Sequence, residues 1–218
     1  MPDLPTAPPV PDRAGSSAFG DLLPLAVRYA AWLAGAGVER GLLGPRETPR
    51  LWDRHLLNSA AVAALLSPGE TAIDVGSGAG LPGIPLALAR PDCAFVLLEP
   101  LARRAAFLDE VVADLGLGPR VRVLRARAEE AARLPDRYDV AVARAVAPLD
   151  RLAGWCLPLL RPGGRLLALK GERAEAEVAG APGLRARVER VGHALVDPPA
   201  TVVVVERPRP GGRRKESR

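Results

Sequence analysis

The sequence feature that most constrains the fold is a short apolar run, Thr71–Val75, followed at once by three alternating glycines and a helical pattern. Gly76, Gly78 and Gly80 come directly after the apolar run. Glycine lacks a Cβ, so such a turn can change direction sharply and lets another molecule approach the backbone closely. The run therefore predicts a buried strand, a ligand-binding loop and a helix that begins near Pro82.

Strand and helix patterns alternate along most of the chain, which indicates an α/β fold with a mainly parallel sheet. The predicted strands are Thr71–Val75, Ala94–Glu99, Val121–Arg125, Asp139–Arg144 and Arg165–Lys170, and the predicted helices are Pro82–Ala89, Leu101–Leu115 and Leu149–Leu160. Two further strands, Val188–Leu195 and Ala200–Glu206, are joined by a connection too short for a parallel crossover. We expect them to form an antiparallel hairpin at the edge of a seven-stranded sheet.

The chain divides into four predicted parts. Residues 1–17 are rich in proline and small residues and are expected to form a disordered leader. Residues 18–68 carry two helical patterns and form an N-terminal helical extension. Residues 69–206 form the α/β domain, and residues 207–218 form a basic tail.

Composition restricts the class of protein. The net charge is +5 and the cations are almost all arginine, because Lys170 and Lys215 are the only lysines. This balance favours a polyanionic partner, although a GC-rich genome would give the same arginine bias. No apolar stretch is long enough to cross a bilayer, and the two cysteines suggest neither disulfides nor a metal site. A cytoplasmic protein is expected.

The glycine spacing discriminates between cofactors. A dinucleotide fingerprint needs GxGxxG, but the sixth position counted from Gly76 is Leu81. A GxGxG turn suits S-adenosylmethionine, whose methionine end can pack on the loop. Glu99 ends the second strand, nineteen residues after Gly80, where its carboxylate can accept hydrogen bonds from both ribose hydroxyls. A surface glutamate at a strand end is the alternative.

The third strand leads to a segment that can meet the adenine ring. Ala128 offers a backbone amide and Glu129 a carboxylate at the level where the base is expected. An acidic helix N-terminus is the alternative interpretation of the same residues.

The chain also resembles a known family. The motifs are Arg54-His55-Leu56-Leu57-Asn58-Ser59, Ile73 to Pro85, Arg103-Arg104 with Phe107-Leu108, Ala143-Arg144-Ala145, Trp155-Cys156 and Ala168-Leu169-Lys170-Gly171. Together they are similar to the bacterial 16S ribosomal RNA guanine-N7 methyltransferases of the RsmG (GidB) family, over roughly Trp52 to Gly171. The resemblance implies a Rossmann-like class I methyltransferase.

The resemblance also implies a substrate and a set of contacts. The substrate would be N7 of a guanine in 16S rRNA (guanine 527 in that family), within the small ribosomal subunit. The implied cofactor contacts are Gly76, Leu81, Ala128, Glu129 and Arg144. Asn58 stands where the family usually has aspartate, and Glu99-Pro100 replaces the commoner Asp-Ser but keeps a carboxylate.

The predicted chemistry needs no general base. The fourth strand ends in Arg144-Ala145-Val146-Ala147-Pro148, without an Asn-Pro-Pro-Tyr motif for an exocyclic amine or a Pro-Cys nucleophile. Guanine N7 has an in-plane lone pair, so alignment and proximity suffice. Arg144 and Lys170 are the candidates for orienting the base. Arg144 could instead hold the methionine carboxylate, and Lys170 could extend to solvent from its strand end.

Four residues are candidate RNA contacts, namely His55, Arg103, Arg104 and Arg151. A structural histidine and solvated helix faces are the alternatives. Other possible functions are methylation of a small molecule or protein by the same fold, and a noncatalytic RNA-binding module. The expected oligomeric state is a monomer.

Overall fold

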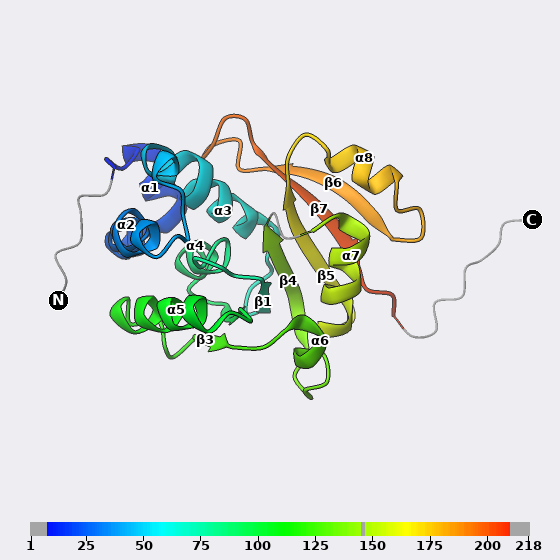
Figure 1. The fold of residues 1–218 in the computed structure, drawn as a ribbon. Helices are drawn as coiled ribbons and strands as arrows, with labels where there is room; N and C mark the ends of the chain where they lie inside the picture. Colours follow the sequence, from blue (N-terminus) through cyan, green and yellow to red (C-terminus); the bar gives the residue numbers. More distant parts are fainter. Residues whose placement is uncertain (1–7, 145–146, 210–218) are drawn as a thin grey trace, which may run out of the picture.

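The computed structural model describes residues 8–144 and 147–209 and is built on one seven-stranded sheet (Figure 1). The strand order is β3-β2-β1-β4-β5-β7-β6. The strands are β1 Thr71–Val75, β2 Ala94–Leu98, β3 Val121–Leu124, β4 Tyr138–Arg144, β5 Leu160–Lys170, β6 Ala186–Val191 and β7 Ala200–Glu206. Strands β1 to β5 are parallel, while β7 runs antiparallel to both β5 and β6. The predicted C-terminal hairpin at the sheet edge is therefore confirmed.

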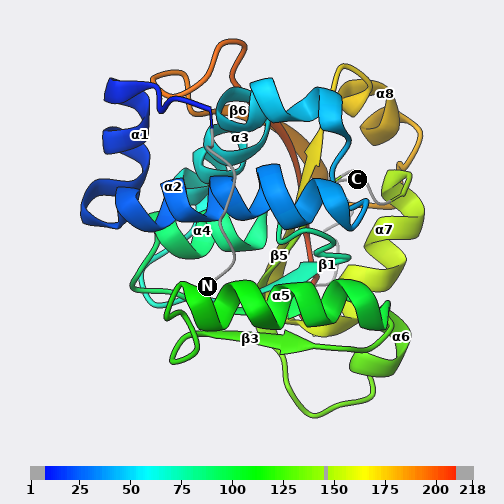
Figure 2. The same ribbon diagram turned by 60° about the vertical axis from the view of Figure 1, so that its left-hand side comes forward.

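Helices cover both faces of the sheet (Figures 1 and 2). One face is covered by α1 Asp12–Phe19, α2 Leu23–Trp32, α4 Gly83–Ala89 and α5 Ala102–Asp114, and the other by α6 Ala128–Ala131, α7 Leu149–Cys156 and α8 Ala174–Ala179. Alternation along the strands supplies both cores: Val140 and Val142 of β4 face the first set, and Ala141 and Ala143 face the second. This burial on both faces explains the nearly continuous apolar strands.

The N-terminal extension continues as an irregular helical segment that leads into β1. It comprises η1 Gly20–Leu22, the π-helix η2 Leu33–Gly37, the 3₁₀-helix η3 Pro45–Arg50, the π-helix η4 Leu51–Leu57, α3 Asn58–Ala60 and the 3₁₀-helix η5 Ala61–Leu65. Leu33, Leu51, Leu56 and Leu57 are almost fully buried, so the extension shares the core of the domain. A last 3₁₀ turn, η6 Leu157–Leu159, precedes β5.

Two features differ from the sequence-based expectations. Helix α1 begins at Asp12, within the segment expected to be a disordered leader, while residues 1–7 lie outside the described residues. Helix α8 was not expected. The expected basic tail lies mostly outside the described residues, which end at Arg209.

Within the described ranges, no helix has the length and apolar character needed to cross a membrane.

Candidate active site at the carboxyl ends of the strands

The glycine loop connects β1 to α4 and lies at the carboxyl edge of the sheet. Gly76, Gly78 and Gly80 all have positive φ, at 74°, 60° and 98°, a conformation that L side chains rarely adopt. A Cβ added at Gly78 would meet only the carbonyl oxygen of Gly76, 3.8 Å away. One side of the loop backbone is thus open to a ligand.

The side chain of Asp74 is hydrogen-bonded to the glycine loop and to the start of α4. One oxygen, Oδ2, accepts hydrogen bonds from Ser77 Oγ at 2.6 Å and from the amide of Gly83 at 3.0 Å. The side chain is completely buried, and this desolvation raises its pKa to about 6. A Cβ at Gly83 would come within 2.4 Å of Leu97 Cδ2 and 2.7 Å of Asp74 Oδ2. Only glycine therefore lets α4 start this close to the sheet.

Glu99 follows β2 directly and contacts the same loop. Its Oε2 accepts a hydrogen bond from the amide of Gly78, and its Oε1 accepts one from the amide of Leu101, both at 3.0 Å. Only 2% of the residue is exposed. Each carboxylate oxygen can accept a further bond, so the residue has the acceptor capacity that a pair of ribose hydroxyls requires. The open glycine loop and this anchored acid fit S-adenosylmethionine.

The segment after β3 reaches the same edge. Ala128 begins the short helix α6, and Glu129 is exposed in its first turn. The neighbouring Glu130 caps the helix by accepting a hydrogen bond from the amide of Arg127 at 2.8 Å. Leu81, in the glycine loop, is 6% exposed. The adenine contacts assigned to Ala128 and Glu129 stay predictions.

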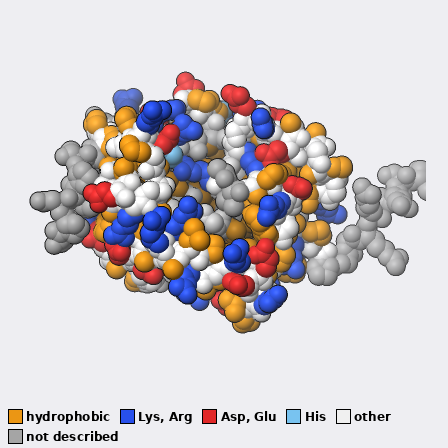
Figure 3. Space-filling model, in the orientation of Figure 1, with side chains coloured by type: hydrophobic (Ala, Val, Ile, Leu, Met, Phe, Trp, Pro, Cys, Tyr) orange, Lys and Arg blue, Asp and Glu red, His pale blue; other side chains and the backbone are white. Residues whose placement is uncertain are grey.

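A cavity of about 540 Å³ opens at the ends of β4 and β5. Its lining comes from the η3 to α3 segment, from these two strand ends and from the loop between β6 and β7: Glu47, Arg50, Asp53, Arg54, His55, Asn58, Arg144, Leu169, Lys170, Gly171, Val196, Asp197 and Pro198. Figure 3 shows basic side chains gathered around the hollowed part of this face. Because β4 lies between β1 and β5, Arg144 stands between the glycine loop and the cavity.

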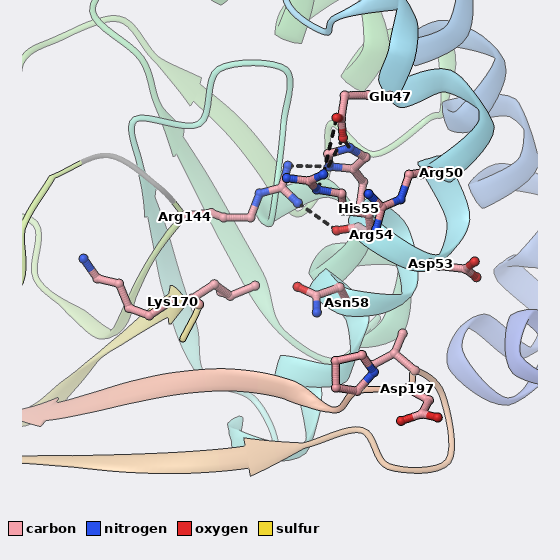
Figure 4. Close-up of a pocket in the computed structure, with 13 residues that line it drawn as sticks. Glu47, Arg50, Asp53, Arg54, His55, Asn58, Arg144, Lys170 and Asp197 are labelled. Atoms are coloured by element: carbon pink, nitrogen blue, oxygen red, sulfur yellow. Dashed lines mark hydrogen bonds and ion pairs between the residues drawn. The ribbon is translucent and has the colours of Figure 1, made fainter. Parts of the chain in front are cut away.

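The guanidinium of Arg144 is held by the N-terminal extension (Figure 4). Its Nη2 lies 2.8 Å from His55 Nδ1, and its Nη1 donates to the carbonyl oxygen of Arg54 at 3.4 Å. On the other side of the imidazole, His55 Nε2 lies 2.8 Å from Glu47 Oε2. Burial and the positive charge of Arg144 lower the pKa of His55 to about 4, so the ring is neutral at physiological pH.

Lys170 lines the cavity, but its ammonium points away from the other labelled residues in Figure 4. The Nζ donates to Glu177 Oε2 and to the carbonyl oxygen of Ala147, both at 2.7 Å. Glu177 Oε2 also accepts a hydrogen bond from the amide of Leu149, at 2.8 Å. The lysine therefore joins β5 to α7 and α8, and its role in orienting a base stays a prediction.

The arginines predicted to contact RNA lie around this edge. Arg103 and Arg104 are in the first turn of α5, and Arg103 is exposed. Arg151 is exposed in the first turn of α7, with its guanidinium 4.7 Å from the ring centroid of Trp155. His55 is separate from them, 6% exposed inside the cavity wall.

The sequence-based analysis did not single out Glu47, Glu177 or the loop at Asp197. One signal was present for Glu47, because Glu47, Arg50 and Arg54 follow one another at helical spacing and so share a face. No comparable sequence signal points to Glu177. Its partner is Lys170, which lies at the end of β5.

The sheet order, the glycine loop after β1 and the acid after β2 together define a class I methyltransferase. One solved structure with this fold is an O-methyltransferase family protein from Burkholderia thailandensis, with a TM-score of 0.55 and 16% identity, covering 88% of this chain and 64% of that one.

The chain belongs to the GidB family, described as rRNA small subunit methyltransferase G, whose model matches residues 23–189. Ribosomal RNA small subunit methyltransferase G of Salinispora tropica is 54% identical, over 96% of this chain and 92% of the relative. The protein of the same name from Mycobacterium marinum is 57% identical, over 90% and 89%. The chain is accordingly an S-adenosylmethionine-dependent methyltransferase.

Proposed function

We propose that this enzyme methylates N7 of a guanine in 16S ribosomal RNA, with the small ribosomal subunit as its substrate. The observation that carries the proposal is the position of Arg144, between the glycine loop on one side and the cavity of about 540 Å³ on the other. The names of the relatives, which specify small-subunit ribosomal RNA, support the same substrate.

Gly76, Gly78 and Glu99 would hold S-adenosylmethionine, which would supply an electrophilic methyl group. Glu99 binds the ribose hydroxyls with the lone pairs that its bonds to Gly78 and Leu101 leave. Leu81, Ala128 and Glu129 would contact the adenosine, with the amide of Ala128 and the carboxylate of Glu129 as partners for the adenine.

Arg144 orients the target guanine. Two of the five N–H groups of its guanidinium contact His55 and Arg54, and the structure gives the other three no partner within the residues it describes. These donors match the O6 acceptor of guanine and leave the N7 lone pair for attack. Since that lone pair lies in the ring plane, no residue has to remove a proton, and the neutral His55 is not needed as a base.

The RNA around the target is held by charge. Arg103, Arg104 and Arg151 begin helices at the same edge as the cavity and contact backbone phosphates. A ribosomal substrate supports a location in the cytoplasm, and a monomer stays the expected oligomeric state.

The decisive experiment is transfer of a radiolabelled methyl group to small ribosomal subunits that lack the modification, with free 16S rRNA in parallel. Mapping of the label should identify N7 of one guanine. Label on a ribosomal protein, at a ring carbon or on an exocyclic amine would overturn the proposed chemistry.

A further inference from the structure

Three side chains from separate parts of the fold form one continuous chain of hydrogen bonds. Glu47 belongs to η3, His55 to η4, and Arg144 ends β4. The distances are 2.8 Å from Glu47 Oε2 to His55 Nε2 and 2.8 Å from His55 Nδ1 to Arg144 Nη2. Figure 4 shows the imidazole between the carboxylate and the guanidinium.

Chemistry fixes the direction of these bonds. Arginine has only donors, so His55 Nδ1 must accept from Arg144. The proton of the neutral ring is then on Nε2, from which it donates to the carboxylate of Glu47. A second proton would put an N–H opposite the guanidinium, and the lowered pKa of His55 agrees with its exclusion.

The imidazole lies between two opposite charges, the carboxylate of Glu47 and the guanidinium of Arg144. Without it, the carboxylate of Glu47 and the guanidinium of Arg144 could pair directly, because an arginine–carboxylate contact is strong and bidentate. Such a pair would draw the guanidinium away from its present position. Arginine also has considerable rotamer freedom, and a fixed partner removes part of that freedom before a ligand binds.

We infer that His55, oriented by Glu47, is a positioning residue that holds Arg144 in the geometry for methyl transfer. The inference rests on the proposed function, in which Arg144 orients the guanine. His55 is 6% exposed and acts from within the wall, whereas Arg144 is partly exposed on the cavity side. The RNA contact predicted for His55 is not required for this role.

Two substitutions of His55 test its hydrogen bonds to Arg144 and to Glu47 separately. In His55→Asn the amide oxygen can take the place of Nδ1 and accept from Arg144, while the bond to Glu47 is lost. In His55→Gln the amide nitrogen can take the place of Nε2 and donate to Glu47, while Arg144 loses its acceptor. The two variants are a matched pair, because each retains a polar amide and only one retains the contact to Arg144.

The kinetics are measured on unmodified small subunits, together with thermal unfolding of each variant. We expect His55→Gln to lower kcat about a hundredfold, the cost of a misplaced group at a reacting centre, with KM and cofactor affinity within about twofold. The kcat of His55→Asn should be at least tenfold higher than the kcat of His55→Gln. Equal losses in both variants, or a kcat of His55→Gln equal to the wild type, would overturn the inference.

A spectroscopic measurement tests the same arrangement without turnover. The chain has only two histidines, His55 and His193, so ¹⁵N-histidine NMR resolves them once His193→Ala is compared. We expect His55 to be protonated at Nε2 alone from pH 8 down to pH 5, and Arg144→Ala to raise its pKa. A doubly protonated ring at pH 7 would contradict the inference.

The outcomes also distinguish a failure of this inference from a failure of the proposed function. If the wild-type enzyme methylates the subunit and His55→Gln is equally fast, only the positioning role fails. If the wild-type enzyme places no label on RNA, the proposed function fails, and the positioning role falls with it.

Discussion

The hydroxyl of Tyr29 donates a 2.8 Å hydrogen bond to the carbonyl oxygen of Ala79, fifty positions further along the chain. Tyr29 lies in α2 and is completely buried, and Ala79 is in the middle of the glycine loop. The N-terminal extension is thereby attached to the loop at the centre of the proposed cofactor site. Cofactor affinity should depend on a helix that does not line the cavity.

Tyr29→Phe tests this attachment. The variant keeps the ring and removes one hydrogen bond, so we expect it to lose about 1 kcal/mol of unfolding free energy. A looser loop should also weaken S-adenosylmethionine binding several-fold, measured by calorimetry. Unchanged cofactor affinity would show that the loop keeps its conformation without α2.

Glu99→Ala should weaken cofactor binding strongly. The substitution removes the proposed acceptor for the ribose and also the two bonds to Gly78 and Leu101 that hold the loop. We expect a loss of about 3 kcal/mol in binding, or roughly a hundredfold in Kd. Glu99→Gln, which keeps one acceptor, should show a smaller loss by calorimetry. An unaltered Kd in Glu99→Ala would exclude the ribose contact.

Lys170→Met should lower the free energy of unfolding. The side chain of Lys170 is 8% exposed and paired with Glu177, so its removal leaves the carboxylate, among the described residues, with the amide of Leu149 as its partner. We expect a loss of about 2 kcal/mol by chemical denaturation, part of which the double variant with Glu177→Gln should recover. Slower methyl transfer without any loss of stability would instead favour Lys170 as an orienting group.

Gly83→Ala should destabilise the domain, because the new Cβ would collide with Leu97 and Asp74. The expected loss is about 2 kcal/mol in unfolding free energy. Gly154→Ala is the matched control: Gly154 is exposed in α7, and a Cβ there meets nothing within 4 Å. That variant should gain up to about 1 kcal/mol from helix propensity. Similar melting temperatures for the two variants would contradict the packing argument.

His55 and Asp74 should give opposite pH dependences of stability. The pKa of His55 is lowered from 6.5 to about 4, so in this window the unfolded chain binds the proton first and stability falls on acidification. The pKa of Asp74 is raised from 3.8 to about 6, so between these values the folded chain binds the proton first and stability rises on acidification. The two effects largely cancel in the wild type.

Single substitutions expose each effect. Between pH 7 and pH 5, Asp74→Asn should lose about 1 to 2 kcal/mol more unfolding free energy than the wild type, and His55→Asn should lose about 1 to 2 kcal/mol less. Urea denaturation at the two pH values, without cofactor, measures both. Parallel pH profiles for all three proteins would rule out the shifted pKa values.

The sheet could be predicted from the sequence because its strands are buried on both faces. Thr71–Val75 and Ala200–Glu206 have the predicted bounds, and the other strands agree closely except at the start of β5 and in β6. The N-terminal helices were less predictable, since 3₁₀ and π segments shift the helical period. Helix α8 has one buried residue, Ala174, and therefore gives no apolar periodicity.

One part of the candidate site could be predicted from the sequence, and another part could not. The positions of the glycine loop, Glu99, Arg144 and Lys170 follow from the rule that parallel strands bring their carboxyl ends to one edge. The contact between His55 and Arg144 does not follow from it, because 89 positions separate them and only the packing of the N-terminal extension brings them together. The pairing of Lys170 with Glu177 likewise depends on where α8 packs.

The place of β7 in the sheet has a consequence for synthesis. Residues 200–206 insert beside β5, the strand that carries Lys170, and the loop before them supplies Asp197 and Pro198 to the cavity. A nascent chain that has not yet delivered this strand has an open edge on β5 and one side of its cavity missing. We therefore expect that methyl transfer requires translation beyond residue 206, and that a chain stopped upstream of it cannot enclose its substrate.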